Sequence, residues 1–105
     1  NKIIKVPIAD IIIDYRATSD LISNACKRGQ KRYKVSGICE ITENIIVALE
    51  ESDNNEIPEY IFAQFHSLNE DEIISEISKR YFNGFSFIGA FQYGDSKWGL
   101  FVKCA

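Results

Sequence analysis

Alternating apolar and polar positions predict six strands in this chain. Between residues 33 and 41, Tyr33, Val35 and Cys39 fall on one side of an extended backbone, and a period of two is typical of a half-buried strand. Pro7 confines the first strand to the edge of a sheet, because proline lacks the N–H that a central strand donates. The expected strands cover residues 3–8, 33–41, 45–50, 60–66, 85–92 and 97–104.

Apolar residues at helical spacing predict a helix over residues 70–82, where Ile73 and Ile77 belong to one apolar stripe. Its N-cap is either Ser67, which has capping-box spacing, or Asn69. An Asn-Gly pair follows the last apolar position, and a glycine there ends a helix in a left-handed conformation.

An earlier helix is expected over residues 19–28, with Thr18 or Ser19 as its N-cap and Gly29 as its end. The segment before it, residues 10–15, fits two interpretations. It either continues the first strand after a bend or forms a helical turn.

The order strand, helix, strand, strand occurs twice, with a polar loop at residues 52–58 between the copies. Sliding the chain by 52 residues aligns the copies without a gap. Five of the seventeen positions from 21 to 37 are then identical, where average composition gives about one. The identical pairs are Ile22/Ile74, Ser23/Ser75, Lys27/Lys79, Arg28/Arg80 and Gly37/Gly89. We therefore expect a single domain, residues 1–105, made of two repeats, 1–52 and 57–105.

One βαββ unit has only a marginal core, so two units are needed to bury the apolar surface of each. We expect an α+β fold: a two-layer sandwich from a tandem βαββ repeat, with six mainly antiparallel strands, two helices on one face and a pseudo-twofold axis. The units either share one sheet or pack sheet against sheet. Gly37 and Gly89 mark either β-bulges or places where another backbone or a helix comes close.

The second half carries Asn83-Gly84-Phe85 after its helix and a final strand that reads Trp98-Gly-Leu-Phe-Val-Lys103. In these features it resembles small bacterial βαββ domains of unknown function, whose helix ends in Gly-aromatic and whose last strand is aromatic and basic. Phe85 stands where that family usually has tryptophan. The resemblance covers the second half alone. It implies the architecture and brings no catalytic residues.

Composition is that of an ordinary globular protein, with 46% hydrophobic and 26% charged residues and a net charge of -3. Residues 35–78 carry eleven of the fifteen acidic residues and no Lys or Arg, whereas residues 27–34 carry five of the twelve basic ones. Unless the fold mixes these segments, we expect an electrically two-sided surface that can steer a charged partner.

The basic residues Lys27, Arg28, Lys31, Arg32 and Lys34 form the candidate patch for a phosphate or a nucleic acid. Cations in the last turn of a helix also interact favourably with its free carbonyl groups and with the helix dipole, which accounts for Lys27 and Arg28 without a ligand. The helix end does not account for Lys31, Arg32 and Lys34. The acidic net charge counts against general nucleic-acid binding.

His66 is the only histidine and lies at the end of an expected strand. Its counterpart in the repeat register is Asp14, and the two form an Asp–His pair in a cleft if the repeat axis passes between the strand ends. The alternative is a strand-end histidine in solvent or hydrogen-bonded near a helix cap.

The three cysteines, Cys26, Cys39 and Cys104, are scattered, and no CxxC or Cys/His spacing is present, so we expect neither a metal site nor a cofactor. We expect small buried apolar side chains at these positions. Scattered thiols suit a reducing compartment, which favours a cytoplasmic location. The chain starts at Asn1 rather than Met, which leaves open whether a leader was removed.

Aromatic residues concentrate in the C-terminal hairpin, where alternation puts Phe87 and Phe91 on one face and Trp98 opposite Phe91. Ile88 and Phe101 then lie on the other face, so both faces are apolar. One chain has too few helices to cover both, which favours a homodimer that packs sheet to sheet, or else a protein partner or a small apolar ligand.

We therefore expect a small non-enzymatic interaction module that self-associates through a sheet face. A second hypothesis is a nucleic-acid or phosphate-binding accessory protein that uses the basic patch. A third is a small-molecule enzyme or sensor with His66 and Asp14 in a cleft. No apolar run approaches the roughly 20 residues that span a bilayer, so we expect no membrane partner.

Overall fold

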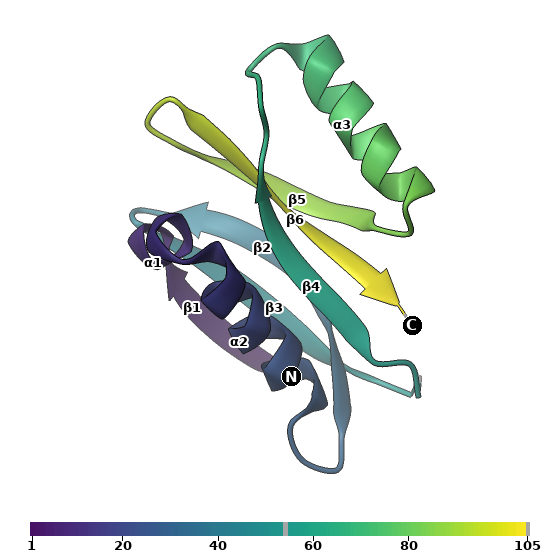
Figure 1. Ribbon diagram of the computed structural model, residues 1–105. Coiled ribbons are helices and arrows are strands. Elements are labelled where there is room, and N and C mark those ends of the chain that lie inside the picture. The colour runs from purple at the N-terminus through teal and green to yellow at the C-terminus, as the bar shows by residue number, and fades with distance from the viewer. Residues whose placement is uncertain (54, 105) are drawn as a thin grey trace.

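The computed structural model describes residues 1–53 and 55–104 of the chain (Figure 1). The first half contains β1 (Lys2–Pro7), α1 (Ile8–Ile13), α2 (Tyr15–Lys27), β2 (Arg32–Ile41) and β3 (Asn44–Ser52). The second half contains β4 (Pro58–Gln64), α3 (Glu70–Phe82), β5 (Ser86–Tyr93) and β6 (Ser96–Cys104). The predicted loop between β3 and β4 has no regular structure at 53 and 55–57, and its Asn54 lies outside the described residues.

Each half forms a three-stranded antiparallel sheet. Sheet A has the order β1-β3-β2 and sheet B the order β4-β6-β5, so corresponding strands take the same places in both. The expected α+β class with six antiparallel strands is confirmed, and β1 is an edge strand, as Pro7 requires. The shared order supports the hypothesis of two repeats.

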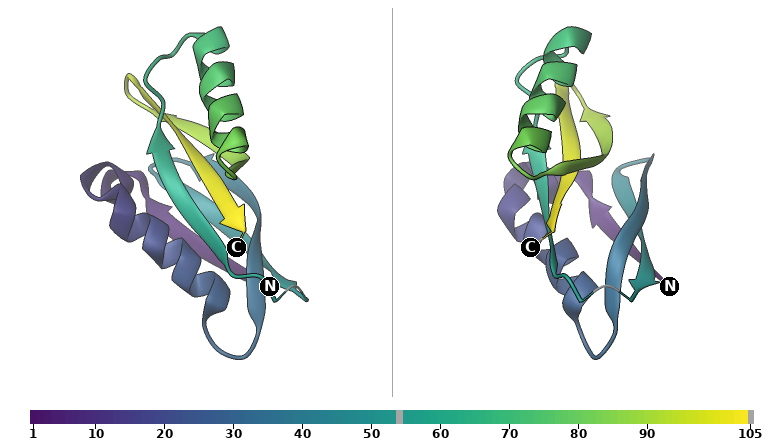
Figure 2. Two further views of the ribbon diagram at one scale, coloured as in Figure 1. Left: turned by 45° about the vertical axis from the view of Figure 1, so that its right-hand side comes forward. Right: turned by 90° about the vertical axis from the view of Figure 1, so that its right-hand side faces the viewer.

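The two sheets pack face to face, and we call the facing sides their inner faces. The main core is formed by the inner face of sheet A, the inner face of sheet B and one side of α2. Helix α2 lies beside β4, whereas α3 covers the outer face of sheet B (Figure 2). The helices therefore do not share one sheet face as expected, because the second sheet takes part of the place on sheet A that a second helix would fill.

Helix α2 begins earlier than expected. The Asp14 side chain caps it by accepting a hydrogen bond from Ala17 N, 3.1 Å away. The expected caps Thr18 and Ser19 lie inside the helix, where both hydroxyl groups donate to Tyr15 O. Residues before Asp14 form the short helix α1, which decides between the two interpretations of that segment.

Helix α3 covers the expected residues, and its cap is Asn69, whose side chain accepts a hydrogen bond from Glu72 N at 3.2 Å. Ser67 instead accepts from Asn69 N. Gly84 follows the helix at φ +90°, the left-handed conformation that the sequence predicts. Among the described residues, no helix has the length and apolar character needed to cross a membrane.

Both mid-strand glycines follow β-bulges at corresponding positions. The register of β2 shifts between Val35 and Gly37, and that of β5 shifts between Phe87 and Gly89. A Cβ atom on Gly89 would lie 2.9 Å from the Ile38 side chain, while one on Gly37 would have nothing within 4 Å. Gly89 is therefore both a bulge position and a place of close approach between the sheets, and Gly37 is a bulge position alone.

The bulges overturn two expectations about which side chains share a face. Beyond the bulge in β2, Cys39 is exposed rather than turned to the core, because the extra residue reverses the alternation. In β5, Phe91 joins the main core while Phe87 lies on the outer face against Phe101. The pairing of Phe91 with Trp98 is confirmed.

Candidate functional site

The basic patch lies against acidic residues of the neighbouring strand. Lys31 Nζ lies 3.0 Å from Glu51 Oε1, and Lys34 Nζ lies 3.4 Å from Glu50 Oε1. The hydrogen bond between the Lys31 and Glu51 side chains raises the pKa of Lys31 and lowers the pKa of Glu51. Because β2 pairs with β3, the fold mixes the basic and acidic segments here, and the two-sided charge expected from the sequence is reduced at this edge.

The rest of the patch is tied to the end of α2. Lys27 is the last residue of that helix and Arg28 is its C-cap. The Arg32 guanidinium donates to Lys27 O at 3.4 Å, which satisfies one of the carbonyl groups left free at a helix end. All three side chains that the helix dipole did not explain in the sequence, Lys31, Arg32 and Lys34, thus have partners within the chain.

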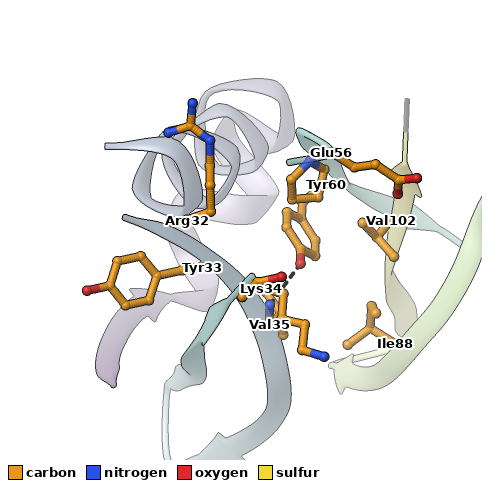
Figure 3. A pocket seen from close by; sticks show the side chains of 10 residues that line it. Arg32, Tyr33, Lys34, Val35, Glu56, Tyr60, Ile88 and Val102 are labelled. Carbon is orange, nitrogen blue, oxygen red and sulfur yellow. Dashed lines mark hydrogen bonds between the residues drawn. The ribbon is translucent and has the colours of Figure 1, made fainter. Parts of the chain in front are cut away.

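Two residues of the patch line a cavity between the sheets. Arg32 and Lys34 border this space of about 160 Å³ together with Tyr60, whose hydroxyl accepts a hydrogen bond from Val35 N at 2.8 Å. Figure 3 shows Tyr60 pointing at Val35, while the Tyr33 ring extends away from it. Ligand pockets usually measure about 300–1,000 Å³, so this space is too small for a nucleotide.

His66 is paired with Glu76 rather than with Asp14. Its ring Nδ1 and its backbone N–H both contact the Glu76 carboxylate. Burial raises the pKa of Glu76, but the hydrogen bonds from His66 and the charges of His66 and Arg80 together outweigh it, and the net pKa is lowered. Since Asp14 caps α2, the expected Asp–His pair is not formed. His66 borders a shallow hollow with Glu76 and Ser75, and its side chain is 86% exposed.

The two cysteines whose side chains the structure describes, Cys26 and Cys39, are both free thiols. Cys26 is fully buried, and this burial raises the pKa of its thiol to about 11. Cys39 is exposed, and the side chain of Cys104 lies outside the described part of the chain. Among the described residues, no cluster of three or more His, Cys, Asp or Glu side chains is placed to hold a metal ion.

The inner face of the C-terminal hairpin and the β6 side of its outer face are covered within the chain, while Phe87 on β5 stays 41% exposed. Its inner face packs on sheet A, and Phe101 on its outer face packs with Ile73 and Ile77 of α3. The expectation of a partner at this hairpin came from a shortage of helices to cover it, and the second sheet removes that shortage.

The bare apolar surface lies instead on the outer face of sheet A. Along β3, Ile45, Val47 and Leu49 point inward and are at most 1% exposed, so the residues between them point outward. On that outer face Ile3 is 70% exposed and Ile41 is 53% exposed. The other small or apolar residues there are Cys39, Ile46 and Ala48, which pair across the three strands.

A second bare surface follows α3. Ile74, Tyr81 and Phe82, which we call the α3 stripe, lie on one side of the helix and are 54%, 68% and 87% exposed. No residue of α3 is buried. Only the adjacent side, with Ile73 and Ile77, contacts sheet B.

The free edge of β1 faces a groove. Lys2, Ile3 and Ile4 form one wall, and Leu21 and Ala25 of α2 belong to the other, around about 870 Å³. In the part of the chain that the structure describes, β1 pairs only with β3. A strand edge open to solvent is a common place for a protein partner to add.

Comparison of the chain with protein-family models, with curated proteins and with solved structures found no match. Sequence reasoning had singled out neither the outer face of sheet A nor the α3 stripe. The glycine that follows the bulge in β2 was the one available signal for the outward turn of Cys39 and Ile41. The exposure of α3 had no signal, since its apolar spacing is that of a packed helix.

Proposed function

We propose that this chain is a small non-enzymatic interaction module that associates with a second copy of itself through the outer face of sheet A. The observation that carries the proposal is the exposure of Ile3 and Ile41 on a face whose counterpart in sheet B is packed in the core. Contiguous apolar surface on a soluble protein marks an association site. The open edge of β1 borders the same face and extends it.

Sedimentation velocity over a range of concentrations tests this function. We expect the wild-type chain to associate as its concentration rises, and Ile3→Glu to abolish the association by placing a charge on the outer face of sheet A. Ile13→Glu is the matched control, because Ile13 is 82% exposed but lies on α1. A chain that stays monomeric up to millimolar concentration, or an assembly that Ile3→Glu leaves intact, would contradict the proposal.

A nucleic-acid or phosphate-binding role of the basic patch is the second candidate. It is supported by the exposure of Lys27, Arg28 and Lys31 along one short segment, and the ion pairs of Lys31 and Lys34 weaken it. This candidate predicts salt-dependent retention on heparin that Lys31→Glu combined with Arg32→Glu removes. Equal elution of the double variant and the wild-type chain would contradict it.

A further inference from the structure

Within the chain, a helix of the first repeat packs along the edge strand of the second repeat, and the proposed self-association can use a contact of the same kind between two copies. Helix α2 lies along the free edge of β4, where Ser23 Oγ accepts from Tyr60 N and Ser19 Oγ accepts from Phe62 N, both at 2.9 Å. Ile22 of the same helix is fully buried. The first unit thus closes the edge strand of the second unit (Figure 1).

Each member of this contact has a counterpart, given by the sequence alignment for the helix and by pairing with the central strands β3 and β6 for the edge strand. On the helix side, the sequence identities match Ile22 and Ser23 with Ile74 and Ser75 of α3, although the observed bounds of the two helices, Tyr15–Lys27 and Glu70–Phe82, are offset by 55 residues rather than 52. On the strand side, Phe62 pairs with Leu100, and Leu100 corresponds to Ala48, whose partner on β1 is Ile3. The contact between α2 and β4 therefore has a counterpart in a contact between α3 of one copy and β1 of another.

Within the described chain, neither α3 at Ile74 and Ser75 nor β1 at Ile3 is covered by another element. Ile74 is 54% exposed and Ser75 is exposed, and Ile3 is 70% exposed. Ala48 O accepts from the Ser36 hydroxyl on β2, so the backbone groups of Ala48 point toward β2. In an antiparallel ladder the backbone groups of Ile3 then point away from β3, toward the free edge. The backbone groups of Ile3 thus hold the same position on the edge of sheet A as those of Phe62, which bind α2, hold on the edge of sheet B.

The sheet faces correspond in the same way. Leu100 and Trp98 on the inner face of sheet B pack against sheet A, and their counterparts Ala48 and Ile46 lie on the bare outer face of sheet A. The surface that would receive that face is the part of the outer face of sheet B that α3 leaves open, along β5, where Phe87 is 41% exposed, whereas Phe101 on β6 is buried under α3.

The charges at the two surfaces are opposite. The first turn of α3 holds Glu70, Asp71 and Glu72, and β1 carries Lys2 and Lys5, all of them exposed. In the internal contact the start of α2 lies near the end of β4, as the bonds of Ser19 to Phe62 and of Ser23 to Tyr60 show. The same orientation brings the acidic turn of α3 toward Lys5, which favours the contact.

From this correspondence we infer that a second copy of the chain docks head to tail, with its β1 edge along α3 and the outer face of its sheet A on the outer face of sheet B. The inference rests on the proposed self-association and names the surface that the second copy uses. Such a contact is heterologous, because each copy gives a different surface to it. It closes into a ring or continues as a chain.

A mixing experiment with two variants tests this arrangement. Ile74→Glu damages only the α3 surface and Ile3→Glu only the sheet A surface, and both residues are exposed, so both variants should fold. We expect each variant alone to sediment as a monomer at a concentration where the wild-type chain associates. Their mixture should form a one-to-one complex, because each supplies the surface that the other lacks. Each variant alone, at the total protein concentration of the mixture, is the control.

The outcomes separate the inference from the proposed function. Association that Ile3→Glu abolishes and Ile74→Glu leaves intact would overturn the head-to-tail contact and keep self-association through sheet A. Two monomeric variants whose mixture stays monomeric would overturn it as well. A monomeric wild-type chain would overturn both proposals. Lys5→Glu and Asp71→Lys provide a second test: each change alone should weaken association, because it puts like charges into the contact. The two single variants mixed, or both changes in one chain, should restore it, because opposite charges then face each other again.

Discussion

Helices α2 and α3 each have 13 residues and occupy the same place in their βαββ units, yet they differ in burial. Helix α2 has five buried residues, among them Ile22 and Cys26, while α3 has none. The difference arises because the strand that follows the first unit, β4, lies along α2. Within the described chain no further unit follows α3. The burial of a helix here depends on the next unit more than on its own sequence.

The largest effect should come from the apolar centre of the α2 contact. Ile22→Ala removes a fully buried side chain and should lower the free energy of unfolding by about 2–5 kcal/mol. Ile74→Ala, the matched change on α3, should alter it by no more than about 0.5 kcal/mol. Urea unfolding at low protein concentration measures both. Similar losses for the two variants would show that α3 is as well packed as α2.

The serine contacts should give the next largest effect. Ser23→Ala takes away the acceptor of Tyr60 N, and a buried donor that loses its partner costs about 1–3 kcal/mol. Ser75→Ala should leave the free energy of unfolding within about 0.5 kcal/mol of the wild-type value, because this serine is exposed. The same unfolding measurement compares the pair, and a loss at Ser75 equal to that at Ser23 would contradict the account.

A pH-dependent effect of comparable size should come from Cys26. Its pKa is raised to about 11 from 9.0 by burial, so between these values the unfolded chain loses the thiol proton and the folded chain keeps it. The free energy of unfolding should therefore fall as pH rises through this window, by at most about 1.4 kcal/mol per pH unit. Cys26→Ala should lack this part of the slope, and Cys39→Ala should keep it. An unchanged slope in Cys26→Ala would contradict the assigned cause.

The smallest effect should come from the ion pairs of the basic patch. Lys31→Ala removes the contact with Glu51, but both side chains are more than half exposed, and solvent screens such pairs strongly. We expect no measurable change in the urea midpoint, at low or at high salt. A clear loss at low salt that disappears at high salt would show that this edge depends on its charges.

Local patterns predicted the six strands and α3, but they missed the start of α2, left α1 open and did not predict which side chains share a face. The spacing of Ile73 and Ile77 and the glycine at 84 predicted α3 correctly, because these features act within one element. The alternation rule failed for Cys39 and Phe91, because it assumes an unbroken ladder and one bulged residue reverses every later side chain.

Features that join distant segments were beyond the reach of local patterns. The pairing of Lys31 with Glu51 depends on the register of β2 against β3, and that of His66 with Glu76 depends on the angle at which α3 returns over its sheet. Ser19 was interpreted as a helix cap, yet its hydroxyl closes the edge of β4. A hydroxyl suits both roles, and only the packing of the second unit decides between them.

Amide hydrogen exchange at Phe62 and Ile3 tests most directly whether the internal contact recurs between chains. Phe62 N–H is bonded to Ser19 within the chain, so its protection should be strong and independent of protein concentration. Ile3 N–H should exchange quickly in dilute protein and become protected as concentration rises, and Ile74→Glu should remove that gain. An Ile3 amide that exchanges at the same rate at every concentration, or whose protection survives Ile74→Glu, would contradict the account.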